Sequence, residues 1–343
     1  MLQKLKSENT DYIFEALRCG IQLIGNLAVD NQFCKDDIWR LIFPDLLWAL
    51  LCVDDERAVG YSSMVLHTCL DEHKVEQLAQ TGNIHLALKV MELCRTQSEL
   101  DWTVLIATQH FLKSSVLVKN MYAGMSHQER VTLLQLISAQ LGEEDSKDCG
   151  IPPTVATFLA SCFQERCGAV LTLASKSDNE EALTVISLLD VLCEMTSDHK
   201  QFMFLQNHPD LLKSTVDLLQ QVHALGKTSK NVLSPNEGNM FCHQQQTSDK
   251  QYRHTTHRHT AVRELDGLPL IMDNCSIDSN NPFISQWAIF ATRNILEHNL
   301  ENQELVAALE RCGVADDSAL RAMGFRVEKR DGNMLLKPCS KDP

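Results

Sequence analysis

The chain has 343 residues and a formal net charge of −14, from 31 basic and 45 acidic side chains. An acidic surface repels phosphate backbones and anionic lipid headgroups, so the composition disfavours nucleic acids and membranes as partners. The longest apolar run, Leu46 to Val53, is much too short to cross a bilayer.

Apolar residues recur at helical spacing from the N-terminus onward, whereas strand patterns are nearly absent, so the fold class is all-α. The first helix is predicted at 10–29, with an apolar stripe from Ile13 to Leu27. The four tryptophans lie among aliphatic residues and are predicted to pack in the core. Further helices are predicted at 57–70, 84–94, 102–118, 128–141, 154–174, 179–195 and 209–225.

The composition changes after residue 225 and divides the chain into three parts. We expect helical repeats over 1–225, a polar and disordered linker over 226–262, and a C-terminal domain over 263–337. The last part contains paired helices and a short helix near 318–323. Its tail alternates apolar and polar residues around Asp331-Gly332, which predicts a small β-hairpin that covers the last repeat.

Two distant stretches carry the same pattern. One apolar helical segment, the first ridge, ends at Asn26-Leu27 and is followed by Asn31-Gln32. A second ridge ends at Asn294-Ile295 and is followed by Asn302-Gln303. A recurring unit of this kind indicates a stacked helical solenoid, because a single unit cannot bury its own apolar face. Solenoids usually bind partners.

The helix that precedes each ridge also repeats. Pro44, Pro209 and Pro269 each stand at the predicted first turn of a helix, where the missing N–H costs nothing. Three helices in roughly 40 residues is the armadillo layout. We therefore predict an armadillo/HEAT-like helical solenoid; the alternative is an irregular helical bundle.

Catalytic patterns are weak throughout the sequence. The strongest candidate is a tract of possible zinc ligands. Residues spaced i,i+2 do not share one face of a helix, so these side chains would not point toward a common metal ion. Its members are Cys242, His243, His254, His257 and His259. No Gly-rich phosphate loop, His-Glu-x-x-His motif or serine nucleophile elbow accompanies it. We expect no enzyme activity, no metal and no cofactor.

Asparagine on the third helix of such a repeat can bond the backbone of an extended peptide, although it can equally cap or tie adjacent helices. The partner-groove candidates are Asn26, Asn31, Arg293, Asn294 and Asn302. Ser234, followed by Pro235, is a candidate phosphorylation site. The thirteen cysteines form no Cys-x-x-Cys pair, and six of them lie in apolar helical runs, which fits free thiols in the cytoplasm.

Several dispersed stretches closely resemble the ataxin-10 family. They include Phe14 to Ala28, Gln128 to Leu134, Glu264 to Cys275 and Gly324 to Glu328. The resemblance covers almost the whole chain apart from about 235–262. In that region the family has one more helix of the kind that stands third in each three-helix repeat. The family also has a longer N-terminal portion.

The resemblance implies a non-enzymatic, armadillo-like scaffold that self-associates. It further implies roles in neuronal survival, in neurite outgrowth through Ras–MAP kinase signalling and in cytokinesis. The implied partners are a heterotrimeric G-protein β subunit, O-linked N-acetylglucosamine transferase and a ciliary nephrocystin. The implied locations are the cytoplasm and perinuclear region, the midbody, the centrosome and the ciliary base. A transport adaptor that binds extended peptides is the alternative.

Overall fold

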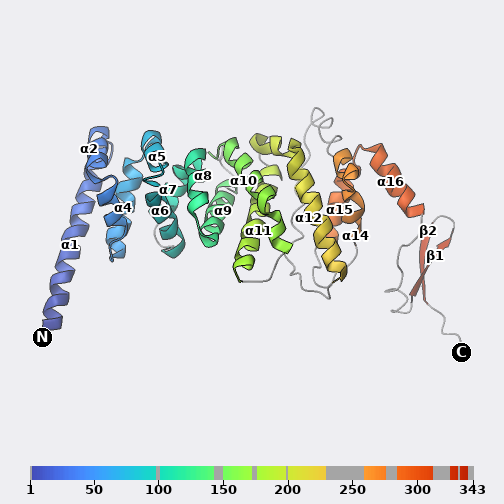
Figure 1. Ribbon diagram of the computed structural model, residues 1–343, viewed down its shortest axis with the longest axis horizontal. Coiled ribbons are helices and arrows are strands. Elements are labelled where there is room, and N and C mark those ends of the chain that lie inside the picture. The colour runs from blue at the N-terminus through green and yellow to red at the C-terminus, as the bar shows by residue number, and fades with distance from the viewer. Residues whose placement is uncertain are drawn as a thin grey trace.

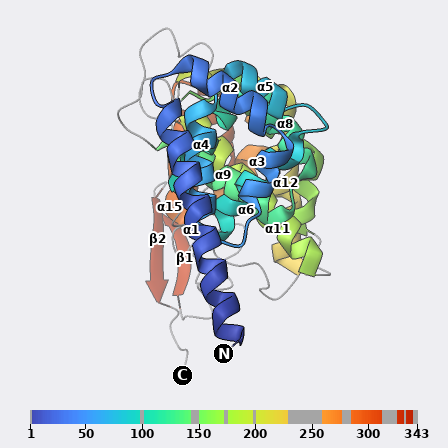
Figure 2. The same cartoon turned by 90° about the vertical axis from the view of Figure 1, so that its left-hand side faces the viewer.

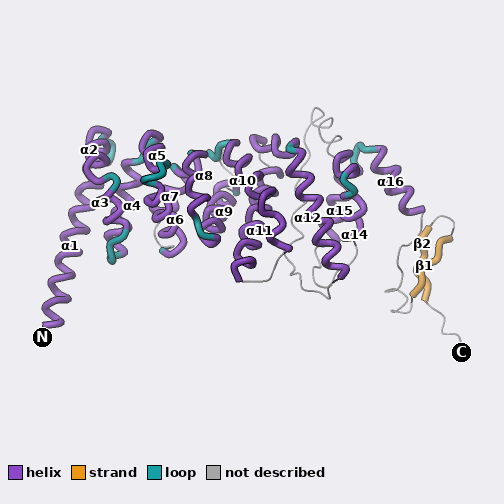
Figure 3. Tube along the Cα trace, viewed as in Figure 1, coloured by secondary structure: helices purple, strands orange, loops and turns teal. Residues whose placement is uncertain are grey.

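The computed structural model describes residues 2–97, 101–142, 150–171, 176–197, 200–228, 259–275, 284–311, 325–330 and 333–338. The helices stand side by side along one long axis, with α1 at one end and α16 near the other (Figure 1). Among the described residues, strands occur only at the C-terminal end (Figure 3). The predicted all-α solenoid is thereby confirmed, and an irregular bundle is excluded.

The N-terminal half consists of the long helix α1 followed by shorter helices. They are α1 (Leu2–Ala28), α2 (Gln32–Ile42), α3 (Asp45–Leu51), α4 (Glu56–Cys69), α5 (Glu72–Leu78), α6 (Ile84–Thr96), α7 (Asp101–Gln109), the 3-10 helix η1 (Phe111–Lys113), α8 (Ser115–Gly124) and α9 (His127–Leu141). 

The C-terminal half contains helices of mixed length. They are α10 (Pro153–Arg166), η2 (Cys167–Leu171), α11 (Lys176–Ser197), η3 (Lys200–Asn207), α12 (Pro209–Thr228), α14 (Gly267–Asp273), α15 (Ile284–Leu296) and α16 (Leu300–Arg311). A further short helical segment covers 259–264.

Polar residues in the turns decide where these helices begin. Asp55 and Asp71 accept hydrogen bonds from the backbone N–H groups at the starts of α4 and α5, and Ser114 does the same for α8. Ser126 and Glu129 form a capping box at the start of α9. Such caps satisfy N–H groups that have no partner inside the helix. Because Ser114 starts a new helix, the single helix predicted at 102–118 is instead three elements.

The first two complete units have three helices each, α2–α3–α4 and α5–α6–α7. The last helices of successive units pack on one another, so that α4 lies between α1 and α7. The first helices are joined by polar contacts: Trp39 Nε1 on α2 donates to Gln77 Oε1 on α5 (2.8 Å), and Asn120 Nδ2 on α8 donates to Ala79 O (2.8 Å). Each unit therefore contacts its neighbours along the stack.

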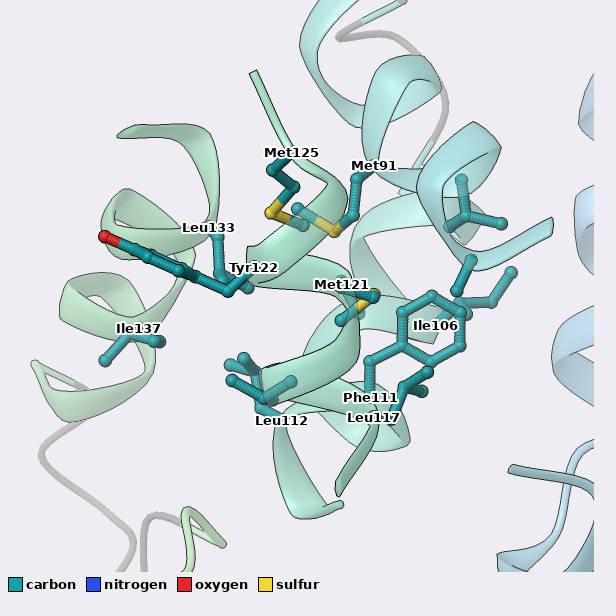
Figure 4. Close-up of a cluster of buried hydrophobic side chains, with 14 of the residues drawn as sticks. Met91, Ile106, Phe111, Leu112, Leu117, Met121, Tyr122, Met125, Leu133 and Ile137 are labelled. Carbon is teal, nitrogen blue, oxygen red and sulfur yellow. The ribbon is translucent and has the colours of Figure 1, made fainter. Parts of the chain in front are cut away.

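One hydrophobic core runs along the stack from Ile21 on α1 to Leu218 on α12. In its middle, Met91, Ile106, Phe111 and Met121 come from successive helices and fill the space between them (Figure 4). A smaller core lies among the 259–264 segment, α14 and α15, and the half-buried Leu212 and Leu219 of α12 pack against it. The helix α12 therefore takes part in both cores.

The strands β1 (Phe325–Arg330) and β2 (Asn333–Pro338) pair antiparallel, with Val327 opposite Leu336. This pair stands where the sequence predicts a hairpin, and it lies beyond the end of α16 (Figure 1). The short helix predicted at 318–323 falls outside the described residues.

The predicted linker differs from the structure at both of its ends. The helix α12 continues to Thr228, and helical residues begin again at 259. Residues 229–258 lie outside the described part, so the division into 1–225, 226–262 and 263–337 stays a prediction. Within the described part, no helix is long and apolar enough to span a membrane.

Candidate interaction surfaces

The corner between α1 and α2 contains the first predicted site residues. Asp30 has a left-handed backbone (φ 55°), and Asn31 follows it as the cap of α2. Asn31 Oδ1 accepts the N–H of Cys34 (3.1 Å). The side chain of Asn31 therefore serves the start of a helix, which satisfies an otherwise unpaired backbone donor.

The corner between α15 and α16 has the same backbone geometry. His298 has a left-handed backbone (φ 54°), and Asn299 Oδ1 accepts the N–H of Asn302 (3.0 Å). Asn299 is thus the counterpart of Asn31, and Asn294 and Asn26 both lie five residues before these caps. The sequence-based pairing of Asn31 with Asn302 is wrong by three residues.

Asn302 is not available to a partner. Its side chain is fully buried, and its Nδ2 donates to His259 O (3.0 Å) and Ile295 O (3.1 Å). It therefore ties the start of α16 to the end of α15 and to the 259–264 segment. The assignment of Asn302 to a partner groove is therefore wrong, and its role is structural. A buried amide forms its hydrogen bonds with other groups of the protein.

The remaining candidates stand at opposite ends of the stack. Asn26 is exposed on α1, whereas on α15 Arg293 is exposed and Asn294 is half-buried. The two helices are separated by the length of the solenoid (Figure 1). The structure therefore does not bring these residues into one groove, and each remains a candidate by itself.

A cluster of aromatic and polar side chains lies across α4 and α7, and sequence reasoning did not find it. The His67 ring lies 5.4 Å from the Trp102 ring and 5.2 Å from the His110 ring, measured between centroids. His67 Nε2 donates to Gln109 Oε1 (2.9 Å). We call His67, Trp102, Gln109 and His110 the α4–α7 cluster.

The α4–α7 cluster is partly open to solvent. Trp102 is 37% exposed, which corrects its prediction as a core residue, whereas Trp39 is buried as predicted. Burial lowers the pKa of His110 to about 4, and the nearby His67 and Lys113 act in the same direction. His110 is therefore neutral at physiological pH. Tryptophan with adjacent hydrogen-bonding groups is typical of protein-binding surfaces.

The described residues contain no group of three or more His, Cys, Asp and Glu side chains placed to hold a metal ion. Burial raises the pKa values of Cys69 and Cys162 to about 11, so both thiols are protonated at neutral pH and are poor nucleophiles. Of the predicted histidine tract, only His259 is described, and its carbonyl accepts from Asn302. The rest of the tract and Ser234 fall outside the described residues.

Comparison with known proteins gives consistent matches. Residues 248–337 match the family model described as the Spinocerebellar ataxia type 10 protein domain. The chain is 39% identical to ataxin-10 of Xenopus tropicalis, over 96% of this chain and 71% of that protein. It is 39% identical to ataxin-10 of Bos taurus and 38% identical to that of Homo sapiens, in both cases over 100% of this chain and 75% of the relative.

Proposed function

Because the chain belongs to the ataxin-10 family, we propose that it acts as a non-enzymatic, armadillo-like scaffold that binds other proteins. The observation that carries this proposal is the α4–α7 cluster, in which an exposed tryptophan lies beside two histidines and a glutamine. Such a surface offers apolar area and hydrogen-bonding groups together, and aromatic residues of this kind often dominate binding energies.

The proposed roles follow from the family. They are neuronal survival, neurite outgrowth through Ras–MAP kinase signalling and regulation of cytokinesis. The proposed partners are a second copy of the chain, a G-protein β subunit, O-linked N-acetylglucosamine transferase and a ciliary nephrocystin. The proposed locations are the cytoplasm and perinuclear region, the midbody, the centrosome and the ciliary base. The hairpin is proposed to cover the last repeat.

Affinity purification from cell lysate, followed by mass spectrometry, tests this proposal. We expect the chain to recover the transferase, the G-protein β subunit or centrosomal proteins above an equally acidic control protein. Trp102→Ala should reduce recovery of at least one of these partners. Trp48→Ala is the matched control, because Trp48 is 39% exposed but lies on α3. Recovery of chaperones alone by the wild-type chain would contradict the proposal.

A transport adaptor that binds extended peptides is the second candidate, and the exposure of Asn26 on α1 favours it. An acidic protein would attract basic peptides, and salt would weaken that attraction. This candidate predicts that basic peptides bind with strong salt dependence and that Asn26→Ala weakens them. Binding that is unchanged by Asn26→Ala would exclude it.

A further inference from the structure

The hydrogen-bonding groups of the α4–α7 cluster are mostly unused within the described part of the chain. His67 Nε2 donates to Gln109 Oε1 (2.9 Å), which leaves both hydrogens of Gln109 Nε2 free. The indole N–H of Trp102 and the ring nitrogens of His110 form no hydrogen bond with the residues that the structure describes. Polar groups of this kind on a partly exposed surface are available to a ligand.

The α4–α7 cluster lies within the stack, away from its ends. The helix α4 packs between α1 and α7, and α9 follows on the other side of α7. Figure 2 looks along the stack and shows α1 in front of α4. Helices therefore stand on both sides of the cluster, and yet Gln109 is exposed and Trp102 is 37% exposed. The opening to solvent is thus a property of the surface that α4 and α7 form together.

Trp102, Leu105 and Gln109 share one face of α7. Their spacing of i, i+3 and i+7 places them within about 60° of one another around the helix. Trp102 and Gln109 are two turns apart, which is about 10 Å along the helix axis. The His67 ring approaches from α4 and lies 5.4 Å from the Trp102 ring. This face therefore carries an aromatic ring at one end and an amide at the other, with the half-buried Leu105 between them.

The groups around the cluster disfavour charged ligands of either sign. The unused groups are mainly donors, and an ammonium or guanidinium group would leave them unpaired because it cannot accept a hydrogen bond. Asp101 is exposed beside Trp102, and the chain has a net charge of −14, so a carboxylate or phosphate would be repelled. Lys113 and Asp71 shift the pKa of His110 in opposite directions, so neither sign dominates there. The ligand that remains is an uncharged acceptor, such as a peptide carbonyl.

We propose that the α4–α7 cluster binds an extended, proline-rich segment of a partner protein. The inference rests on the proposed function, because it names the chemistry of a partner for the same surface. A proline ring would pack on the exposed indole of Trp102, and peptide carbonyls would accept hydrogen bonds from Trp102 Nε1 and Gln109 Nε2. Proline-rich segments commonly dock on surfaces that carry aromatic side chains.

A polyproline II segment matches the cluster better than other extended peptides do. Its carbonyls form no internal hydrogen bonds, so they can all accept from the protein. Proline also lacks an N–H, so the segment brings few donors to a surface whose amide acceptor, Gln109 Oε1, is already bound by His67. The conformation rises about 3.1 Å per residue, so carbonyls three residues apart nearly match the roughly 10 Å between Trp102 and Gln109 along α7.

Titration calorimetry of the whole chain with a capped, uncharged peptide tests the proposal. The probe peptide contains Pro-x-x-Pro twice, and the control peptide has alanine in place of every proline. We expect saturable binding of the proline peptide, at least about tenfold tighter than that of the alanine peptide. Because no ion pair forms, raising the salt from about 0.05 M to about 0.5 M should leave the affinity within about twofold. The basic peptides of a transport adaptor would instead bind with strong salt dependence.

Substitutions in the cluster locate the bound peptide. Trp102→Ala should weaken binding at least about tenfold, because aromatic anchors dominate such contacts. Trp102→Phe keeps a ring but loses the N–H, and Gln109→Leu loses the amide donor, so each should weaken binding about two- to tenfold. Trp48→Ala is the matched control, since Trp48 is 39% exposed and its ring lies 5.0 Å from that of His85. Circular dichroism verifies folding, and the exposed Gln109 provides the test if Trp102→Ala unfolds.

The results separate this inference from the proposed function. A wild-type chain that binds the two peptides equally, or binds neither, would overturn the inference, whereas Trp102-dependent binding of whole partner proteins would still support the proposed function. Peptide binding that survives both Trp102→Ala and Gln109→Leu would also overturn it, since the segment would then dock elsewhere. A chain that binds the proline peptide through Trp102 but none of the proposed partner proteins would support the inference and contradict those partners.

Discussion

Arg18 on α1 holds the carboxylate of Asp55 through two of its nitrogen atoms, and the same carboxylate caps α4. Arg18 Nε donates to Asp55 Oδ1 (2.9 Å), Nη2 contacts Oδ2, and the Ala58 N–H donates to Oδ1 (2.8 Å). Hydrogen bonding from Arg18 lowers the pKa of Asp55, and its effect outweighs that of burial. One residue thus fixes both the start of α4 and its docking on α1.

Replacing Asp55 with alanine should destabilise this end of the solenoid. Loss of a helix cap alone lowers the free energy of unfolding by about 1 kcal/mol, and loss of the Arg18 contact adds to it. Urea unfolding measures the change. Asp37→Ala is the control, because Asp37 forms only an exposed pair with Arg40 on its own helix. Equal stability of the two variants would show that the Asp55 contacts contribute nothing.

Lys74 should contribute stability over a defined pH range. Its side chain is 6% exposed, and Nζ binds Asp36 Oδ1 (2.8 Å) and Asp71 Oδ2 (2.5 Å). Burial tends to lower the pKa of Lys74, but its bonds to the two carboxylates raise it overall. The bond from Lys74 lowers the pKa of Asp36; for Asp71, burial acts upward, but the Lys74 bonds outweigh it and the pKa falls.

The direction of each shift sets the range. The carboxylates of Asp36 and Asp71 contribute to folding stability at pH values above the ordinary Asp pKa of about 3.9. This contribution disappears as the pH falls through their lower folded pKa values. The ammonium group of Lys74 contributes fully to folding stability at pH values below the ordinary Lys pKa of about 10.4. It loses this contribution only as the pH rises through its higher folded pKa. We therefore expect Lys74→Met to cost about 1–2 kcal/mol at pH 7 and progressively less in acid. A cost that is constant between pH 7 and pH 2 would contradict this account.

Trp39 should stabilise the stack through a hydrogen bond as well as through its ring. Its ring stacks on Phe43 at 4.5 Å, and Nε1 donates to Gln77 on the next unit. Trp39→Phe keeps an aromatic ring but leaves Gln77 Oε1 without this donor, which should cost about 1–3 kcal/mol. The matched substitution Trp48→Phe, at an exposed position, should cost much less in thermal unfolding. A larger effect at Trp48 would be inconsistent with the packing described.

Asn302 should hold the last unit together. Asn302→Ala removes two hydrogen bonds from a buried site and leaves the carbonyls of His259 and Ile295 without that donor, which we expect to cost about 2–3 kcal/mol. Hydrogen exchange should speed up in the 259–264 segment and in α16. Gln303→Ala removes only one exposed contact, to Leu296 O (2.7 Å), and should change exchange little. Faster exchange confined to α16 would show that the segment is held by other contacts.

The sequence predicts the helices well because local features decide them. Pro209 is the first residue of α12, and Pro269 lies in the first turn of α14, as the rule for proline requires. Asp30 and His298 set the repeat corners, yet neither is glycine, so no composition signal marks their left-handed backbones. That is why the register of Asn302 was assigned wrongly.

The candidate surface was less predictable than the fold. His67 and Trp102 are far apart in the sequence and meet only because α4 packs on α7. A tryptophan among aliphatic residues is predicted to lie in the core. Helical spacing does not show which face of the helix a neighbouring helix covers, so this prediction can fail. The same holds for Asn26. The sequence predicts its position in the repeat, but the exposure of its side chain depends on how α1 packs.

Direct binding of purified partners tests the central claim that this chain is a protein-binding scaffold. The full chain would be titrated by calorimetry with the purified G-protein β subunit and with the purified O-linked N-acetylglucosamine transferase. We predict saturable binding of at least one of them, weakened by Trp102→Ala and unchanged by Trp48→Ala. Absence of binding to both, with a chain shown to be folded, would contradict the account.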